Sequence, residues 1–249
     1  MRIQEEQFLD AFRRPIAERA RRAPADPDGF VAWFEELRAS GPGQGDPLFP
    51  WLETTATMRE MRWFLTQEVA GEAGFDDLVA LAQIKLPIQP KLELARNYWD
   101  EMGRGGEPGM HGPMLARVAR TLEVDLTADV VPEALALANL VTAFAVNRRY
   151  AYHAIGALGV IELTAPDRTR SVNLGLKRLG VNAHVRQYFA LHSTLDIEHS
   201  IAWNREVLRP LVAQQPAIAV ALAEGALMRL SAGAACFDRY RRHFGLGPS

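Results

Sequence analysis

The chain has 249 residues, of which 48% are hydrophobic and 23% charged, and its formal net charge is −2. These values are ordinary for a globular protein and give no electrostatic reason to expect nucleic acid or an anionic membrane as a partner. The single cysteine, Cys236, excludes an intramolecular disulfide, and the acidic N-terminus lacks the apolar segment of a signal peptide. The sequence contains no run of about 18 apolar residues, so no membrane span is predicted. We expect a cytoplasmic protein.

Residues 1–50 are predicted to form a short N-terminal helical extension. Two amphipathic stretches, 5–22 and 28–39, are separated by Pro- and Gly-rich segments that are typical of turns. We therefore divide the chain into an extension, 1–50, and a main domain, 51–249.

The remainder of the chain has a helical pattern, because apolar residues recur at spacings of three and four. Helices are predicted at 54–83, 89–103, 113–123, 131–164 with a break near 147–152, 168–179, 183–212 and 215–244. Prolines such as Pro166 fall at the predicted junctions. Long helices with short links predict an all-α bundle of about seven core helices.

Two histidines and one carboxylate share a helix face near residue 195. At 100° per residue, His192, Asp196 and His199 fall within about 60° of one another. Buried polar side chains are costly unless they are paired or bind a metal, and imidazole with carboxylate is a common ligand set. The stripe therefore predicts metal ligands. A surface stripe that happens to contain two histidines is the alternative.

Glu162 is a lone carboxylate that follows a run of apolar residues and glycines. On such a face, a carboxylate indicates a cation or a metal. The alternative is a glutamate near a helix end that reaches solvent just before Pro166.

Glu101 shares a predicted helix face with Leu94 and Tyr98 and is expected to point inward, whereas Asp100 points aside. The helix is expected to break at the glycines that follow, and His111 comes next in the sequence. His111 is either a ligand that folds back over the site or an ordinary loop residue.

The first long helix offers Glu68 and Glu72 on one side. We predict Glu68 as a ligand and Glu72 as its substitute, and a salt bridge or a solvated edge is the alternative for either. Cys236 has no histidine near it in sequence, so a nucleophilic role is not expected.

In this order, these residues resemble the iron-containing redox enzymes with a heme-oxygenase-like fold, called heme-oxygenase-like diiron oxidases and oxygenases. That family has a Glu on the first core helix, a Glu and a His around a helix break, a lone Glu, and then His-x-x-x-Asp-x-x-His. The last motif corresponds to His192, Asp196 and His199. The resemblance covers about residues 54–244.

The resemblance implies a heme-oxygenase-like bundle that holds two ferrous ions and uses O2 to oxidise a small organic substrate. C–H cleavage, oxidative decarboxylation or fragmentation, and N-oxygenation are the implied reactions. The implied metal ligands, with no catalytic residue beyond them, are Glu68, Glu101, His111, Glu162, His192, Asp196 and His199. We assign Glu101, His111, Glu162 and His199 to one iron and the other three to the second, with Glu101 or Glu162 as the bridge. A homodimer and an external electron donor are also expected, and manganese is an alternative metal.

Two other functions stay open. One is a mononuclear iron or manganese oxidase on the same fold. The other is a non-catalytic helical binding protein, whose buried polar stripes would be hydrogen-bond networks. The number of metal ions bound per chain, two, one or none, distinguishes the diiron enzyme, the mononuclear enzyme and the binding protein.

Overall fold

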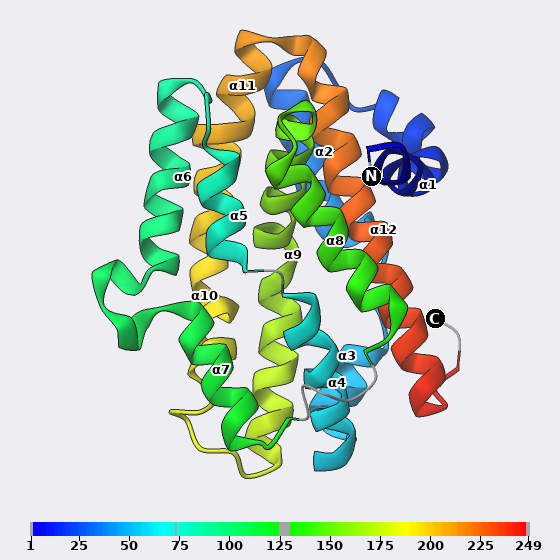
Figure 1. Ribbon diagram of the computed structural model, residues 1–249, viewed down its shortest axis with the longest axis vertical. Helices are drawn as coiled ribbons and strands as arrows, with labels where there is room; N and C mark the ends of the chain where they lie inside the picture. Colours follow the sequence, from blue (N-terminus) through cyan, green and yellow to red (C-terminus); the bar gives the residue numbers. More distant parts are fainter. Residues whose placement is uncertain (1, 73, 125–129, 248–249) are drawn as a thin grey trace.

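The computed structural model describes residues 2–72, 74–124 and 130–247, and every regular element within these ranges is a helix (Figure 1). In the same ranges, the only strand-like pairing is an isolated bridge between Met102 and Met110. The predicted all-α class is confirmed. The α-helices are α1 (Arg2–Arg21), α2 (Pro27–Ser40), α3 (Leu48–Thr54), α4 (Met58–Gly71), α5 (Phe75–Ala82), α6 (Ile88–Glu101), α7 (His111–Thr121), α8 (Pro132–Val146), α9 (Ala151–Arg178), α10 (Gln187–Ala202), α11 (Arg209–Gln214) and α12 (Ala219–Phe244).

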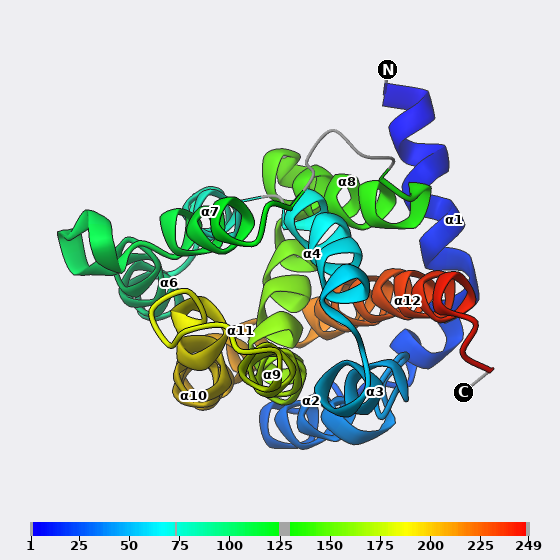
Figure 2. The same cartoon turned by 90° about the horizontal axis from the view of Figure 1, so that it is seen from below.

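Helix α9 is the central element of the bundle (Figures 1 and 2). It packs along α10 and α12, and α2, α3 and α8 also contact it. On the other side of α12 lies α1, whereas α6 packs against α5 and against the segment that follows α10. A long helix that contacts most of its neighbours places its side chains at the centre of the molecule.

Two glycines allow α9 and α12 to approach closely. A Cβ atom on Gly156 would collide with the backbone carbonyl of Leu222, and one on Gly225 would collide with the carbonyl of His153. Larger residues at these positions would push the two backbones apart. The glycines therefore set the spacing of the helix pair that carries much of the core.

The apolar core consists of two clusters. One contains Phe34, Phe144 and Trp203 and joins α1, α2, α5, α6, α8, α11 and the first halves of α9 and α12. The other contains Leu52 and Phe64 and joins α3, α4, α7, the start of α10 and the second halves of α9 and α12. Polar residues on α9 are thus placed between two apolar regions.

The predicted extension packs against the bundle. Helix α1 lies on α12, and α2 lies on α11 and α9. Leu9, Phe30 and Phe34 are fully buried in the first core cluster. The boundary at residue 50 stays a prediction.

The predicted helix at 54–83 is two helices, α4 and α5. The break falls before Gly74, whose φ of +68° is a backbone conformation that few residues other than glycine adopt. The predicted break between α8 and α9 is confirmed, and it contains a single 3₁₀ turn, Arg148–Tyr150.

Pro166 does not separate two helices as predicted, because α9 continues through it to Arg178. Proline lacks the N–H that would bond the carbonyl of Glu162. Packing of α10 and α12 along α9 keeps the helix continuous despite this loss.

The predicted helix 183–212 begins later, at Gln187, and widens into a π-helical segment, Trp203–Leu208. The wider segment ends just before Pro210, whose ring would crowd the carbonyl four residues earlier in a regular α-helix. π-helical turns of this kind often occur beside functional sites.

The segment Pro216–Phe244 is long and apolar enough to cross a membrane by length and composition. Most of its apolar stretch is buried against α1, α8 and α9. A buried core helix meets the same criterion.

Candidate metal centre

A tight reversal of the chain brings His111 beside Glu101. Glu101 is the last residue of α6, and His111 is the first residue of α7. Between them Gly103 has a φ of +61°, and a Cβ atom there would collide with the backbone of Gly109. The chain can therefore fold back on itself, and Nδ1 of His111 lies 2.5 Å from Oε2 of Glu101.

The predicted residues gather in two groups that share Glu101. One group contains Glu101, His111 and His192, and the other contains Glu101, Glu162 and His199. In each group, one ligand atom per residue lies within 4.8 Å of the others. A carboxylate common to two adjacent groups is an arrangement that can bridge two metal ions.

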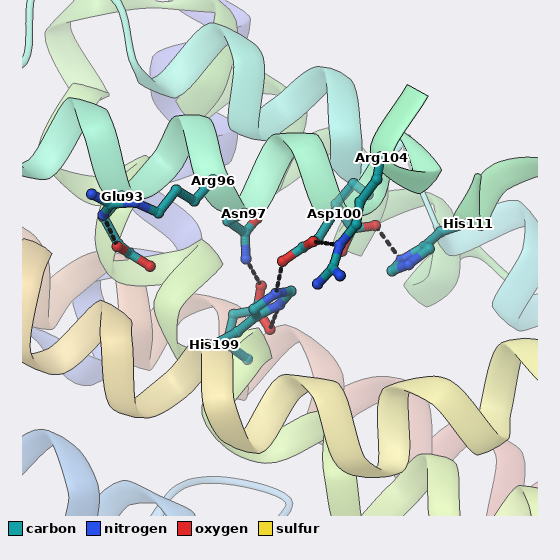
Figure 3. A network of polar contacts seen from close by, with 9 residues as sticks. Glu93, Arg96, Asn97, Asp100, Arg104, His111 and His199 are labelled. Atoms are coloured by element: carbon teal, nitrogen blue, oxygen red, sulfur yellow. Dashed lines mark hydrogen bonds and ion pairs between the residues drawn. The ribbon is translucent and has the colours of Figure 1, made fainter. Parts of the chain in front are cut away.

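Hydrogen bonds orient the second group (Figure 3). Nδ2 of Asn97 donates to Oε1 of Glu162 at 2.6 Å, and Oε2 of Glu162 faces Nδ1 of His199 at 3.4 Å. The other ring nitrogen of His199, Nε2, donates to Asp100 at 3.3 Å, and Asp100 also accepts from Arg104. A carboxylate behind a histidine fixes the tautomer and the orientation of a metal ligand.

His192 is also held in one tautomer. Its Nδ1 lies 2.8 Å from the carbonyl oxygen of Tyr188, which can only accept a hydrogen bond. Nδ1 must therefore carry the proton, and Nε2 keeps a free lone pair for a metal. The ring packs edge-on against His111, with centroids 4.5 Å apart.

The three histidines differ in charge. Burial lowers the pKa of His111 and of His192 to about 4, so both rings are neutral near pH 7. Burial also acts to lower the pKa of His199, but Glu162 and Asp100 outweigh it and raise this pKa to about 9. Without a metal, His199 is protonated, and a bound ion would have to displace that proton.

Four carboxyl groups lie close together in this region. Burial, reinforced by the charge of Glu162, raises the pKa of Glu101 and of Asp196 well above the usual range. Burial and the charge of Glu101 raise the pKa of Glu72 to about 8. A divalent cation would relieve this repulsion.

Several buried polar atoms lack hydrogen-bond partners among the described residues. They include Nδ1 of His111, Nδ1 of His199 and Oδ1 of Asp196. The two histidine nitrogens face carboxylate oxygens without hydrogen-bond geometry, as ligands of a common ion do. The donor set of nitrogen and carboxylate oxygen suits iron or manganese. These residues therefore fit a metal centre.

A partly open cavity of about 140 Å³ adjoins the two groups. It lies where the two core clusters meet, between α4, α5, α9, α10 and α12. Its polar lining includes Glu101, Glu162, His192 and Asp196, and its walls are mostly apolar. The arrangement places a small molecule next to the candidate metal ligands.

The structure does not bring all seven predicted ligands together. Glu68 and Asp196 line the cavity but lie outside both groups. His111 is grouped with His192, rather than with Glu162 and His199 as assigned from the sequence, because the reversal after α6 turns it toward α10. Glu72, the substitute for Glu68, lies close enough to Glu101 for their charges to interact.

Three polar residues near the groups were missed by sequence reasoning. Asp100 was expected to point aside but faces His199. Asn97 lies one helical turn before Glu101, so the same face periodicity could have found it. Asp76 on α5 is close enough to act electrostatically on Glu101 and His111, and no local pattern in the sequence marks it.

Comparison with known proteins agrees with this geometry. The profile of a family described as iron-containing redox enzymes matches residues 62–234. A CADD-like protein of unknown function from Nostoc punctiforme superposes with a TM-score of 0.66 at 15% identity, over 90% of this chain and 99% of that chain. A domain of unknown function with a heme oxygenase-like fold from Shewanella denitrificans gives a TM-score of 0.55 at 15% identity, over 88% and 91%. No match was found among the curated proteins. The predicted heme-oxygenase-like fold is confirmed.

Proposed function

Because the chain belongs to the family of iron-containing redox enzymes, we propose that it holds two iron ions and uses O2 to oxidise a small organic substrate. The observation that carries the proposal is the shared position of Glu101, which belongs to both groups of candidate ligands. A hydrogen-bond network built only for stability would not need to leave buried histidine nitrogens without aligned partners.

Each iron would have its own histidine ligands. His111 and His192 would hold one ion, and Glu162 and His199 would hold the other, with Glu101 between them. Asp196 and Glu72 line the same cavity, so either could complete the coordination. When bound, two ferrous ions supply electrons to O2 and so make an oxidant for an unactivated substrate bond.

The protein's own residues prepare the site for that chemistry. Asn97 fixes one oxygen of Glu162, and Asp100 fixes the ring of His199. The carbonyl of Tyr188 keeps Nε2 of His192 unprotonated. Apolar walls that include Leu137 and Val141 limit the entry of water to the cavity.

Anaerobic titration with Fe(II) tests the proposal. We expect close to two ions bound per chain, and Glu101→Gln should weaken both because it removes the shared charge. Glu107→Gln is the matched control, since Glu107 is exposed and lies in the loop just beyond α6. Failure of the wild-type protein to bind any iron would contradict the proposal.

A mononuclear site is the second candidate, and one observation favours it. Glu101, His111 and His192 form a set of two histidines and one carboxylate, which alone can hold a single non-heme iron. The same titration separates the two candidates. One ion per chain, with no effect of His199→Ala on its affinity, would favour the mononuclear site.

A further inference from the structure

The cavity has a second polar end, formed by two arginines. Arg168 comes from α9 and Arg229 comes from α12, and both line the cavity. Both side chains are half-buried and contribute to the lining of the cavity. Neither arginine is a candidate metal ligand, and the proposed metal centre gives neither of them a role.

Neither guanidinium has a carboxylate partner among the described residues. No ion pair within 4.0 Å involves Arg168 or Arg229 in that part of the chain, although many surface arginines there form one. Nη2 of Arg168 donates to Oγ1 of Thr164 at 3.0 Å, and its guanidinium lies over the ring of Phe237. Each guanidinium has five N–H donors, so most of them remain available.

Glu68 acts on both guanidiniums without forming an ion pair with either within 4.0 Å. It is the carboxylate that acts most on Arg168, and it also acts on Arg229. Burial lowers the pKa of Arg168 to about 10, so this guanidinium is still protonated near pH 7. Asp196 also acts on Arg168 and Glu72 on Arg229, but no carboxylate among the described residues lies within ion-pair distance of either guanidinium.

A glycine makes room for one of the arginines. A Cβ atom on Gly233, one turn beyond Arg229 on α12, would lie 2.9 Å from Nη1 of Arg229. The guanidinium therefore lies along the helix, where Gly233 has no side chain.

We propose that Arg168 and Arg229 bind the carboxylate of the substrate, and that this substrate is a monocarboxylic acid whose apolar body extends through the cavity toward the metal ligands. The planar guanidinium fork matches the two oxygens of a carboxylate. An anion with an apolar body fits this lining better than inorganic phosphate does. The apolar walls, which include Phe64, Leu137 and Phe189, match a hydrocarbon body.

The positions along α9 set the orientation. Arg168 lies six residues beyond Glu162, which corresponds to about 9 Å along the helix axis. The carboxylate end is thus held away from the metal ligands, and the carbon that reacts is one several bonds from the carboxylate. The role of this acid as a substrate rests on the proposed oxidase function, whereas its binding to the arginines does not.

Calorimetric titration of the metal-free protein tests the proposal. Straight-chain carboxylates from hexanoate to dodecanoate are compared with the alcohol and the amine of the same chain length. We expect at least one carboxylate to bind, and to bind about tenfold or more tightly than its alcohol, because charged hydrogen bonds are lost in the alcohol. The amine should bind more weakly still.

Arg168→Gln and Arg229→Gln should each weaken carboxylate binding by about tenfold or more and leave alcohol binding unchanged. Arg170→Gln is the matched control, because Arg170 is exposed on the same helix. Circular dichroism checks that the variants fold, and the comparison of ligands on the wild-type protein stands even if they do not.

Absence of binding by every carboxylate, equal binding of carboxylate and alcohol, or tighter binding of inorganic phosphate would each overturn the proposal. Carboxylate binding that survives both substitutions would do so as well. Because no metal is present, these results are independent of whether the protein binds two irons. A protein that binds acids but no iron would disprove the oxidase and keep the carboxylate site.

Discussion

The ring of His199 lies between two carboxylates, with Nε2 3.3 Å from Asp100 and Nδ1 3.4 Å from Glu162. The two contacts differ in role. Glu162 belongs to a candidate metal group, whereas Asp100 lies outside both groups. Asp100 would therefore act on a bound metal through His199, as a residue that orients the ring.

We predict that Asp100→Asn lowers the affinity for iron by about 10–100-fold without unfolding the bundle, as is typical when the partner of a histidine ligand is removed. Competition between the protein and a coloured Fe(II) chelator measures the change. Asp77→Asn, an exposed carboxylate on α5, is the control. An unchanged affinity in Asp100→Asn would show that the ring needs no such support.

The grouping of the histidines makes a separate prediction. His111→Ala and His192→Ala should each lose the same iron ion, so the double variant should still bind one ion per chain. The combination of His192→Ala with His199→Ala should lose both ions. Iron content after anaerobic loading and desalting measures this, with the exposed His184→Ala as control. Loss of both ions from the His111/His192 double variant would contradict the grouping.

The close approach of α9 and α12 predicts a large cost for a single methyl group. Gly225→Ala should lower the free energy of unfolding by about 1–3 kcal/mol, because the Cβ atom would collide with the backbone of α9. Gly112→Ala is the control, since nothing lies within 4 Å of its added Cβ. There the change should stabilise α7 by a few tenths of a kcal/mol or more. Urea denaturation followed by circular dichroism compares the two, and equal midpoints would contradict the packing.

Cys236 is predicted to be unreactive in the folded protein. It is buried, and burial raises the pKa of its thiol to about 12. The thiolate, which is the reactive form, is therefore scarce at pH 8. Alkylation by iodoacetamide, followed by mass spectrometry, should be slow without urea and fast with it. Rapid alkylation of the folded protein would contradict this.

The raised pKa of the Cys236 thiol also makes the stability of the fold depend on pH. An unfolded chain loses this proton near pH 8.5, whereas the folded chain keeps it until about pH 12. The thiol therefore reduces stability as pH rises from about 8.5, and it has no effect at neutral pH. Cys236→Ala should make the decline of the unfolding free energy above pH 8.5 less steep.

Local patterns were enough to find most of the candidate site. His192, Asp196 and His199 lie on one helix, so their common face follows from helical geometry alone. Glu101 and His111 are joined by a short glycine-rich segment, and their proximity depends only on that turn. The all-α class follows from the same periodicity.

Features that depend on tertiary packing were not predictable. Pro166 reads locally as a junction, but contacts with α10 and α12 keep α9 continuous. The grouping of His111 with His192 and the placement of Asp76 near Glu101 depend on how separate helices meet. Arg168 and Arg229 are far apart in sequence, and only the packing of α9 against α12 brings them to the same cavity.

The most direct test of a diiron site built on Glu101 is to load the protein anaerobically with Fe(II), mix it with oxygenated buffer and measure the O2 consumed. Two ferrous ions held by the same carboxylate should react together, so we expect one O2 per two irons in a single kinetic phase that Glu101→Gln abolishes. A reaction no faster than that of Fe(II) in buffer, or an unchanged rate in protein that holds one iron per chain, would contradict a diiron oxidase.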